Sequence, residues 1–552
     1  MKTAATGSGS FALFSLPHRS RTLLVAVGFL LAACGGGGGG SSGTPPASTY
    51  TIDLAFDRLA PDTRSSFTVT ATLRKDGALL GGEAANIGVT LGRGSNDSPT
   101  EISTGVYRFT VTPSQTGEHP VTVSYRGAST TRTALVLESV NADWGQPMAV
   151  EGLVNTPGYE DGVTITPDGE YLFVQYGPFY FSAFQLFDLP RASGGCGGNR
   201  LVPDRCTHTW LDEAIGPYTG PERPGFFTGR ISGTSNLHNA NSWGIGIDQV
   251  PIFAPSTMFY GFHRQPDGSF AEPFYLAFAD DNDALTNPYG LSFMLHGDGT
   301  ATVLFTLDDP TDPDWVDLDN NGTDDVESGK DVYTTEITLG QNNILGTFMP
   351  SGVPGTHPVR GTPFPSQLVN FGKTGPDGIA GTQGNPHLYQ SGGTVKSIWT
   401  DDEYDTDTDR GEISAYVLTA GTLTAGNWTK VVLPGPVNQA DPSNEIQPFF
   451  TGAGLYFTHS SDVALPEIFY SAYSGTDSVA GYQNAANWGA LTKILGVGAA
   501  DSVGKVIAIG EPTVATRSDG EYLYFVYGVI RDNSDPTGIP DINMQAGYVK
   551  KR

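Results

Sequence analysis

The chain has 552 residues, a formal net charge of −28 and a sequence pI of about 4.5. Such an acidic chain argues against nucleic-acid binding and against broad contact with anionic lipid. Its 72 glycines and 38 prolines are typical of many short strands joined by tight turns, and its length exceeds that of one ordinary domain.

Residues 1–33 have the features of an export signal. Three cations precede an apolar run at residues 23–31 (LLVAVGFLL), which has the length of a signal-peptide core and is too short to span a bilayer. The run ends in LAAC at residues 31–34, which resembles the lipobox of bacterial lipoproteins. The resemblance implies cleavage before Cys34 and lipidation of its thiol. The alternative is an ordinary signal peptide with a chance cysteine.

Gly35 follows the predicted lipidated cysteine, and the absence of an Asp there favours the outer membrane over the inner one. The sequence does not decide whether the protein faces the periplasm or the cell surface. Residues 34–48 are predicted to be a flexible Gly/Ser tether that Pro45 and Pro46 stiffen at its exit. Residues 1–33 contain three cations and no acidic residue, so their removal changes the formal charge from −28 to −31. Such a surface suits an exported protein.

Residues 49–140 alternate apolar and polar side chains in short runs, which predicts a β-sandwich. Residues 105–127 (GVYRFTVTPSQTGEHPVTVSYRG) resemble the last strands of bacterial Ig-like and filamin-type domains. The resemblance implies a spacer or adhesive module without chemistry of its own.

Two cysteines besides Cys34 lie in a Gly-rich segment, at Cys196 and Cys206. In an oxidising compartment we expect them to form one local disulfide. The alternative is a metal pair, but the sequence offers no second Cys/His pair at ligand spacing nearby.

Residues 141–552 contain an internal repeat. Residues 160–177 (EDGVTITPDGEYLFVQYG) match residues 510–528 (GEPTVATRSDGEYLYFVYG), and weaker copies begin at Asn287, Asn385 and Asn444. The repeats resemble those of TolB-type β-propellers and, more distantly, the five-bladed domains of some glycoside hydrolases. The predicted fold is therefore all-β, an Ig-like β-sandwich followed by a β-propeller of five or six blades. A single large β-sandwich is the alternative to the propeller.

A propeller would bring the polar residues that lead each repeat towards one central mouth. These residues are Glu160, Asp161, Asn287, Asn385, His387, Glu445 and Glu511. For glycosidase chemistry, Asp161 would be the base and Glu445 or Glu511 the acid. Alternatively, these side chains hydrogen bond the backbone of neighbouring blades, as the resemblance to TolB-type repeats implies.

Residues 317–328 (DLDNNGTDDVES) resemble a calcium-binding loop of the EF-hand type. The expected ligands are Asp317, Asp319, Asn321, Thr323 and Asp325. Position 12 is a serine, so we expect a modest affinity and a structural role for calcium. A solvated acidic turn is the alternative.

Two classes of function remain open from the sequence. The first is a membrane-anchored exported protein whose acidic propeller binds a glycan, a polymer or a partner protein. The second is an exported glycoside hydrolase that uses the carboxylates at the propeller mouth. Whether the chain is an enzyme is therefore left undecided.

Overall fold

The computed structural model describes residues 48–59, 66–155, 159–177, 258–279, 288–308, 330–341, 343–346, 367–368, 384–403, 411–439, 443–461, 464–498, 502–532 and 541–552. The signal segment, Cys34, most of the tether, Cys196, Cys206, Asn287 and the calcium-type loop lie outside these ranges. The chain divides into Met1–Ser48 and a compact unit, Thr49–Arg552. Among the described residues, no helix has the length and apolar character needed to cross a membrane.

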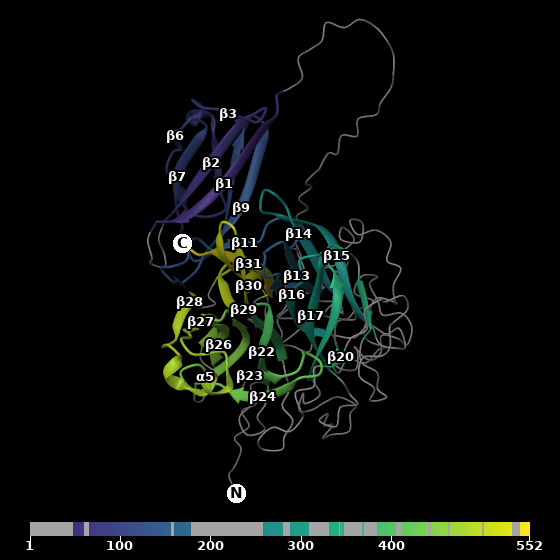
Figure 1. Cartoon of the computed structure of the whole chain (residues 1–552). Helices are drawn as coiled ribbons and strands as arrows, with labels where there is room; N and C mark the ends of the chain where they lie inside the picture. The colour runs from purple at the N-terminus through teal and green to yellow at the C-terminus, as the bar shows by residue number, and fades with distance from the viewer. Residues whose placement is uncertain are drawn as a thin grey trace, which may run out of the picture. The chain divides into compact units, whose positions relative to one another are not determined.

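The N-terminal part of this unit is a β-sandwich (Figure 1). One sheet contains β1 (Tyr50–Arg58), β2 (Phe67–Lys75), β3 (Ala78–Leu79), β5 (Ser95–Asn96), β6 (Thr100–Ser103) and β7 (Val106–Thr112). The facing strands are β4 (Gly88–Leu91), β8 (Gly117–Tyr125) and β9 (Ala128–Val136), and a short 3₁₀ helix, η1 (Ala84–Asn86), precedes β4. In β2 and β8 every second side chain is buried, as the alternating pattern predicts, and these side chains form one core between the sheets.

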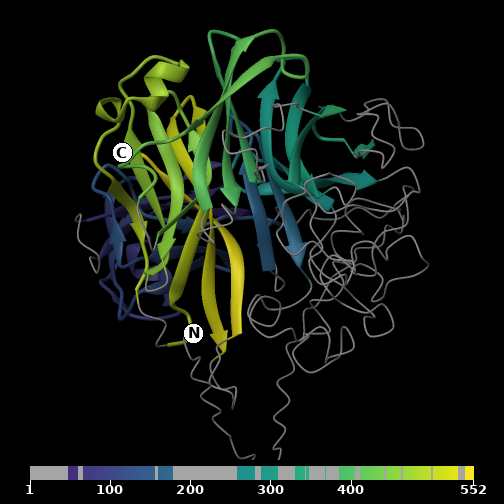
Figure 2. The same ribbon diagram turned by 90° about the horizontal axis from the view of Figure 1, so that it is seen from below.

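The rest of the described chain forms five four-stranded blades, which resolves the predicted range of five or six (Figure 2). The first blade is β12 (Tyr159–Ile165), β13 (Tyr171–Gly177), β14 (Met258–Arg264) and β15 (Phe270–Ala279). The second is β16 (Pro288–Leu295), β17 (Thr300–Asp308), β18 (Lys330–Thr338) and β20 (Gln367–Leu368). The third is β21 (Gly384–Ser391), β22 (Thr394–Glu403), β23 (Gly411–Ala420) and β24 (Asn427–Val432).

The fourth blade is β25 (Ser443–Phe450), β26 (Gly454–Ser461), β27 (Ala464–Ala472) and β28 (Thr492–Gly496). The fifth is β29 (Val506–Arg517), β30 (Gly520–Asp532), β31 (Asp541–Lys550) and β11 (Met148–Ala149). Two further strands extend blade edges, β10 (Ser139–Val140) on β28 and β19 (Asn343–Gly346) on β15. Two short helices, α5 (Val479–Gln483) and η4 (Ala485–Asn487), lie between β27 and β28.

The blades close into a ring. The innermost strands β12, β16, β21, β25 and β29 contact one another in that order, and β29 contacts β12 again. Because β11 precedes the first blade but pairs with β31 of the fifth, the two ends of the propeller sequence share one sheet. The same sheet continues from β11 through β9 into the sandwich.

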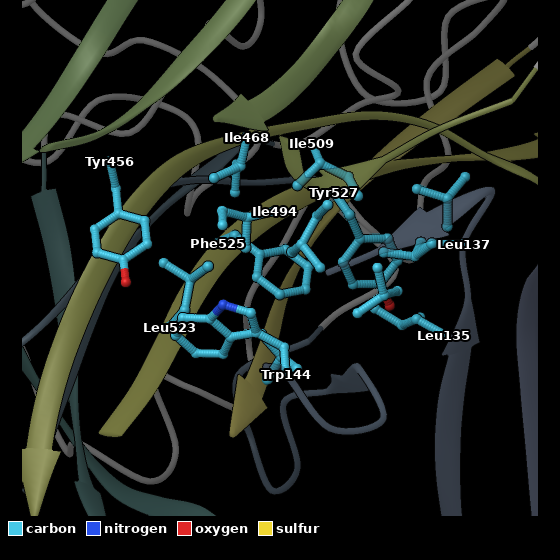
Figure 3. Close-up of a cluster of buried hydrophobic side chains, with 14 of the residues drawn as sticks. Leu135, Leu137, Trp144, Tyr456, Ile468, Ile494, Ile509, Leu523, Phe525 and Tyr527 are labelled. Carbon is cyan, nitrogen blue, oxygen red and sulfur yellow. The ribbon is translucent and has the colours of Figure 1, made fainter. Parts of the chain in front are cut away.

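One apolar cluster fills each interface between neighbouring blades. The cluster between the fourth and fifth blades contains Tyr456, Ile468 and Phe525, and it also takes in Leu135 and Trp144 from the segment that follows the sandwich (Figure 3). Burial of these faces explains why single blades do not need a core of their own.

Several hairpins of the blades use the same turn chemistry. The side chains of Asp168, Asp267 and Asp298 each accept a hydrogen bond from the backbone N–H two residues further on, at 3.0 to 3.1 Å. The following glycine has a positive φ, 77° at Gly169, which a Cβ would disfavour. The repeated Asp-Gly dipeptides therefore fix where the inner and outer strand pairs turn.

Candidate functional site

Each innermost strand carries a β-bulge near its start, where the pairing register shifts. Every bulge contains one residue in the left-handed region of φ. These residues are Gly162 (59°), Gly290 (51°), Asn385 (41°), Gln447 (56°) and Glu511 (54°). All five line one cavity of about 40 Å³, which we call the mouth cavity. A bulge re-aims a side chain out of the regular strand, so the five repeated bulges build the site.

The structure brings Asn385, His387 and Glu511 of the predicted mouth residues to the lining of this cavity. Asp161 immediately precedes Gly162 and hydrogen bonds Glu511. The predicted residues Glu160 and Glu445 precede the bulge residues by two positions, are buried, and do not line the cavity. Asn287 lies outside the described residues.

Sequence reasoning missed Gln447, Gly162 and Gly290. The signal for Gln447 is its place in a Gln-Pro dipeptide that matches Asn385-Pro386 and Glu511-Pro512, since all six residues line the cavity. In the second blade Asn287-Pro288 imitates this dipeptide, but the bulge residue is Gly290, three positions later.

Asp161 and Glu511 form a carboxyl pair between the first and fifth blades. Burial raises the pKa of Asp161, and burial followed by the charge of Asp161 raises the pKa of Glu511 well above its ordinary value. Two carboxyl groups can hydrogen bond only when one of them holds a proton, so the pair shares one proton in this arrangement.

Glu511 also ties its blade to both neighbours. Its Oε2 accepts from the backbone N–H of Val163 in the first blade at 3.0 Å. Its own backbone N–H donates to Oε1 of Gln447 in the fourth blade at 2.9 Å, and the Gln447 amide donates back to Oε1 of Glu511 at 3.4 Å. Both carboxylate oxygens therefore have protein partners.

Asp401 makes the corresponding link between the third and fourth blades. Its Oδ2 accepts from the backbone N–H of Gln447 at 2.7 Å and from the side-chain amide of Asn385 at 2.8 Å. Asp401 is completely buried, so these bonds form in a medium of low polarity. Polar residues of the mouth are thus joined from the first blade through the fifth and fourth to the third.

His387 is buried and neutral at pH 7, because burial lowers its pKa to about 4. Its Nε2 lies 2.9 Å from the backbone carbonyl of Phe450, so this nitrogen carries the proton and donates. Its ring centroid lies 3.9 Å from that of Phe449, which also lines the mouth cavity. His387 therefore supplies a fixed, uncharged ring.

Glu445 faces a different set of partners. Its Oε1 lies 3.0 Å from Nδ1 of His459, and its Oε2 accepts from the backbone N–H of Gln439 at 3.3 Å. The side chain is 1% exposed. Glu445 thus fixes the segment between the third and fourth blades.

The geometry of the carboxyl pair bears on its chemistry. The two carboxyls of a glycosidase stand about 5 to 10 Å apart, with the sugar between them. Asp161 and Glu511 are in direct contact, and the mouth cavity of about 40 Å³ has room for a few water molecules and not for a sugar ring. Among the described residues, no three His, Cys, Asp or Glu side chains are grouped to hold a metal ion.

No protein-family model matches the chain, and no curated protein sequence matches it. Among solved structures, a family 117 glycoside hydrolase from the marine bacterium Zobellia galactanivorans is 9% identical, covers 73% of this chain and 89% of its own, and has a TM-score of 0.34. The α-L-arabinofuranosidase of Lactobacillus brevis is 12% identical, with coverages of 53% and 86% and a TM-score of 0.30. The periplasmic gluconolactonase of Pseudomonas aeruginosa is 12% identical, with coverages of 78% and 79% and a TM-score of 0.24. All three likenesses are weak, with TM-scores below 0.5.

Proposed function

We propose that the protein is an exported, membrane-anchored lipoprotein whose propeller binds an uncharged stretch of a glycan laid across its mouth, with single hydroxyl groups reaching into the small mouth cavity. The observation that carries the proposal is the ring of five left-handed bulge residues that line the mouth cavity. Three of them are not glycine. A non-glycine residue in this conformation costs about 1–3 kcal/mol of backbone strain, and such strained residues are typical of functional sites.

The chemistry of the ring favours sugar hydroxyls as ligands. It offers the side-chain amides of Asn385 and Gln447 and the carboxyl group of Glu511, which is paired with Asp161, so it supplies both hydrogen-bond donors and acceptors and no cation. Pro386, Pro448 and Pro512 add apolar surface between these groups. Such a mixture of apolar walls and a few oriented polar groups is common in small-molecule sites.

The same geometry argues for binding over hydrolysis. Both oxygens of Glu511 are occupied by Val163, Gln447 and the neighbouring carboxyl group. No sugar ring fits between two carboxyl groups that touch. The hydrolase alternative would need the pair to separate, and the shared proton, which leaves one acid and one base, is the observation in its favour.

The experiment is affinity electrophoresis of the full chain, extracted in detergent, in gels that contain one of a panel of neutral polysaccharides. It compares the parent protein with variants of the mouth. Asn385→Gly and Gln447→Gly keep the left-handed backbone, as the first and second blades do, and remove only the amides. We expect at least one polysaccharide to retard the protein and each variant to weaken binding about tenfold, or about 1.4 kcal/mol. The matched control is Glu272→Gly, another left-handed residue (φ 53°), which lies in β15 outside the mouth.

Binding at the mouth would be contradicted if no polysaccharide retarded the protein. It would also be contradicted if Glu272→Gly and Gln447→Gly weakened the binding equally. Release of reducing ends, abolished in Glu511→Gln, would establish the hydrolase instead. The anchor is tested separately, because Cys34→Ala should move the protein out of the membrane fraction. A Cys34→Ala variant that stays in the membrane would refute lipidation there.

A further inference from the structure

A second and larger cavity, of about 550 Å³, lies where the sandwich meets the first and fifth blades. We propose that it is a binding site for a small organic anion, a carboxylate, sulfate or phosphate ester of about the size of a sugar. Its volume falls in the range of about 300–1,000 Å³ that ligand sites occupy, and junctions between domains are where such sites commonly form. We call it the junction cavity.

The charge of the junction cavity is opposite to that of the chain. The whole chain has 58 acidic and 30 basic residues. The basic residues that line the cavity are Arg132, Arg264, Arg517, Lys550, Lys551 and Arg552, and the acidic ones are Asp57, Glu151, Asp267 and Asp519. Cations therefore outnumber carboxylates here, which favours an anion inside an otherwise repulsive field.

Arg132 holds the cavity wall in place. Its guanidinium pairs with Glu151, which precedes the first blade, and donates to the hydroxyl of Tyr548 in β31 at 2.9 Å. It also donates to the backbone carbonyl of Leu54 in β1. Because one side chain of β9 reaches the other sheet of the sandwich and the fifth blade together, the junction is rigid on this side.

Arg517 and Lys550 form a second fixed group around Tyr522. The Arg517 guanidinium carbon lies 4.4 Å from the centre of the Tyr522 ring, and Lys550 Nζ lies 5.2 Å from it. Both cations share one carboxylate, Asp519, at 3.2 and 3.1 Å. Two positive charges against one negative charge leave capacity for a further anion, and their positions are set before a ligand arrives.

Of the six cations that line the junction cavity, Arg264 alone has no carboxylate partner among the described residues. It ends β14 of the first blade and lines the same cavity. A guanidinium presents a planar fork of donors that matches carboxylate, sulfate and phosphate oxygens, so Arg264 is the first choice for a direct contact. The aromatic rings of Phe56, Phe270 and Tyr524 line the cavity too, and they would contact the body of the ligand.

The junction cavity is separate from the mouth. Glu511 lies in the middle of the fifth innermost strand, and Arg517 ends the same strand six residues later. An extended strand of that length spans about 20 Å. Variants of the two sites therefore test different proposals.

The test is isothermal titration of the full chain, in detergent, with glucuronate, glucose 6-sulfate, glucose 6-phosphate and glucose. We expect at least one anionic sugar to bind about tenfold or more tightly than glucose, and its affinity to fall as salt is raised. Arg264→Gln and Arg517→Gln should each weaken this binding about tenfold. Arg74→Gln is the matched control, because Arg74 pairs with Asp53 on the sandwich, outside the junction cavity, and should change affinity by less than about twofold.

Equal affinities for glucose and all three anionic sugars would overturn the proposal, as would the absence of any binding at millimolar concentration. It would also be overturned if Arg264→Gln behaved like Arg74→Gln while both variants kept the melting temperature of the parent. Inorganic sulfate that bound as tightly as glucose 6-sulfate would exclude a contact between the aromatic wall and an organic body.

Discussion

The carboxylate of Glu511 in the fifth blade accepts a hydrogen bond from the backbone N–H of Val163 in the first blade, with an N–O distance of 3.0 Å. The two residues are 348 positions apart in the chain. This bond closes the ring at its inner edge, whereas the pairing of β11 with β31 closes it further out. The side chain best placed for chemistry at the mouth is therefore also one that holds the propeller together.

The shared proton of Asp161 and Glu511 predicts a dependence of stability on pH. Both pKa values are raised in the folded protein, so the fold binds a proton that the unfolded chain releases above its ordinary pKa, 4.5 for Glu. The contribution is fully present below that value and is lost as the pH rises through the folded pKa. Glu511→Gln keeps a hydrogen-bonding group without this titration. We expect the stability of the variant relative to the parent to rise as the pH is raised from 5 to 8.

Urea unfolding at the two pH values measures the difference. Glu511→Ala serves as the control, since it removes both the proton and the partner of Val163. Loss of a partner for a buried N–H costs about 1–3 kcal/mol, so this variant should be destabilised at both pH values. Parallel pH profiles for the parent and Glu511→Gln would show that the pair does not share a proton.

The lowered pKa of His387 predicts that the stability of the fold falls as the pH is lowered, which is the opposite of the effect of the carboxyl pair. Its folded pKa is lowered to about 4 from 6.5, so the unfolded chain takes up a proton first as the pH falls. Stability from this group is fully present above pH 6.5 and is lost as the pH falls towards 4, by roughly 3 kcal/mol. His387→Gln should remove most of this loss, as measured by melting temperatures from pH 7 to pH 4. The control His263→Gln changes a partly exposed histidine of β14 and should leave the acid limb unchanged.

The sequence carried enough information to predict the architecture. Alternation in β2 and β8 and the repeated Asp-Gly turns are local properties of the chain, and the structure confirms an all-β fold of a sandwich followed by a propeller. The match between residues 160–177 and 510–528 indicated equivalent blades, and these segments supply β12–β13 and β29–β30. The Ig-like kinship of the sandwich, the lipid anchor, the disulfide and the calcium loop stay predictions.

The mouth was harder to predict, because its register depends on bulges. A single extra residue moves a side chain from one face of a strand to the other. A proline follows the bulge residue in the third, fourth and fifth blades but not at Gly162 or Gly290, so the sequence marks the bulge in only three of the five blades. Glu445 and Gln447 are two positions apart on one strand, yet only Gln447 lines the cavity. The junction cavity could not be predicted at all, since Arg132, Arg264 and Arg517 come from segments more than a hundred residues apart.

Gly290 offers a test of how tightly the bulges pack. A Cβ at this position would lie 2.7 Å from the Cα of Asn385 in the third blade, and the φ of Gly290 is 51°. Gly290→Ala should therefore destabilise the protein by the left-handed cost of about 1–2 kcal/mol plus a steric cost between blades. Gly297→Ala is the matched control, because its φ is 77° and a Cβ there meets nothing within 4 Å. Equal urea midpoints for the two alanine variants would mean that the second and third blades do not touch at the bulge.

The apolar cluster between the fourth and fifth blades should be sensitive to the loss of one large side chain. Phe525 is completely buried there, together with Leu135 and Trp144 from the segment after the sandwich. Truncation of a buried phenylalanine costs about 3–5 kcal/mol, so Phe525→Ala should lower the free energy of unfolding by that amount in urea titrations. Leu465→Ala, at a side chain that is 40% exposed, should change it by less than about 0.5 kcal/mol. Because Leu135 and Trp144 pack in the same cluster, tryptophan fluorescence should report the loss at the same urea midpoint as circular dichroism. Separate midpoints in Phe525→Ala would show that the sandwich side of the cluster is not coupled to the fifth blade.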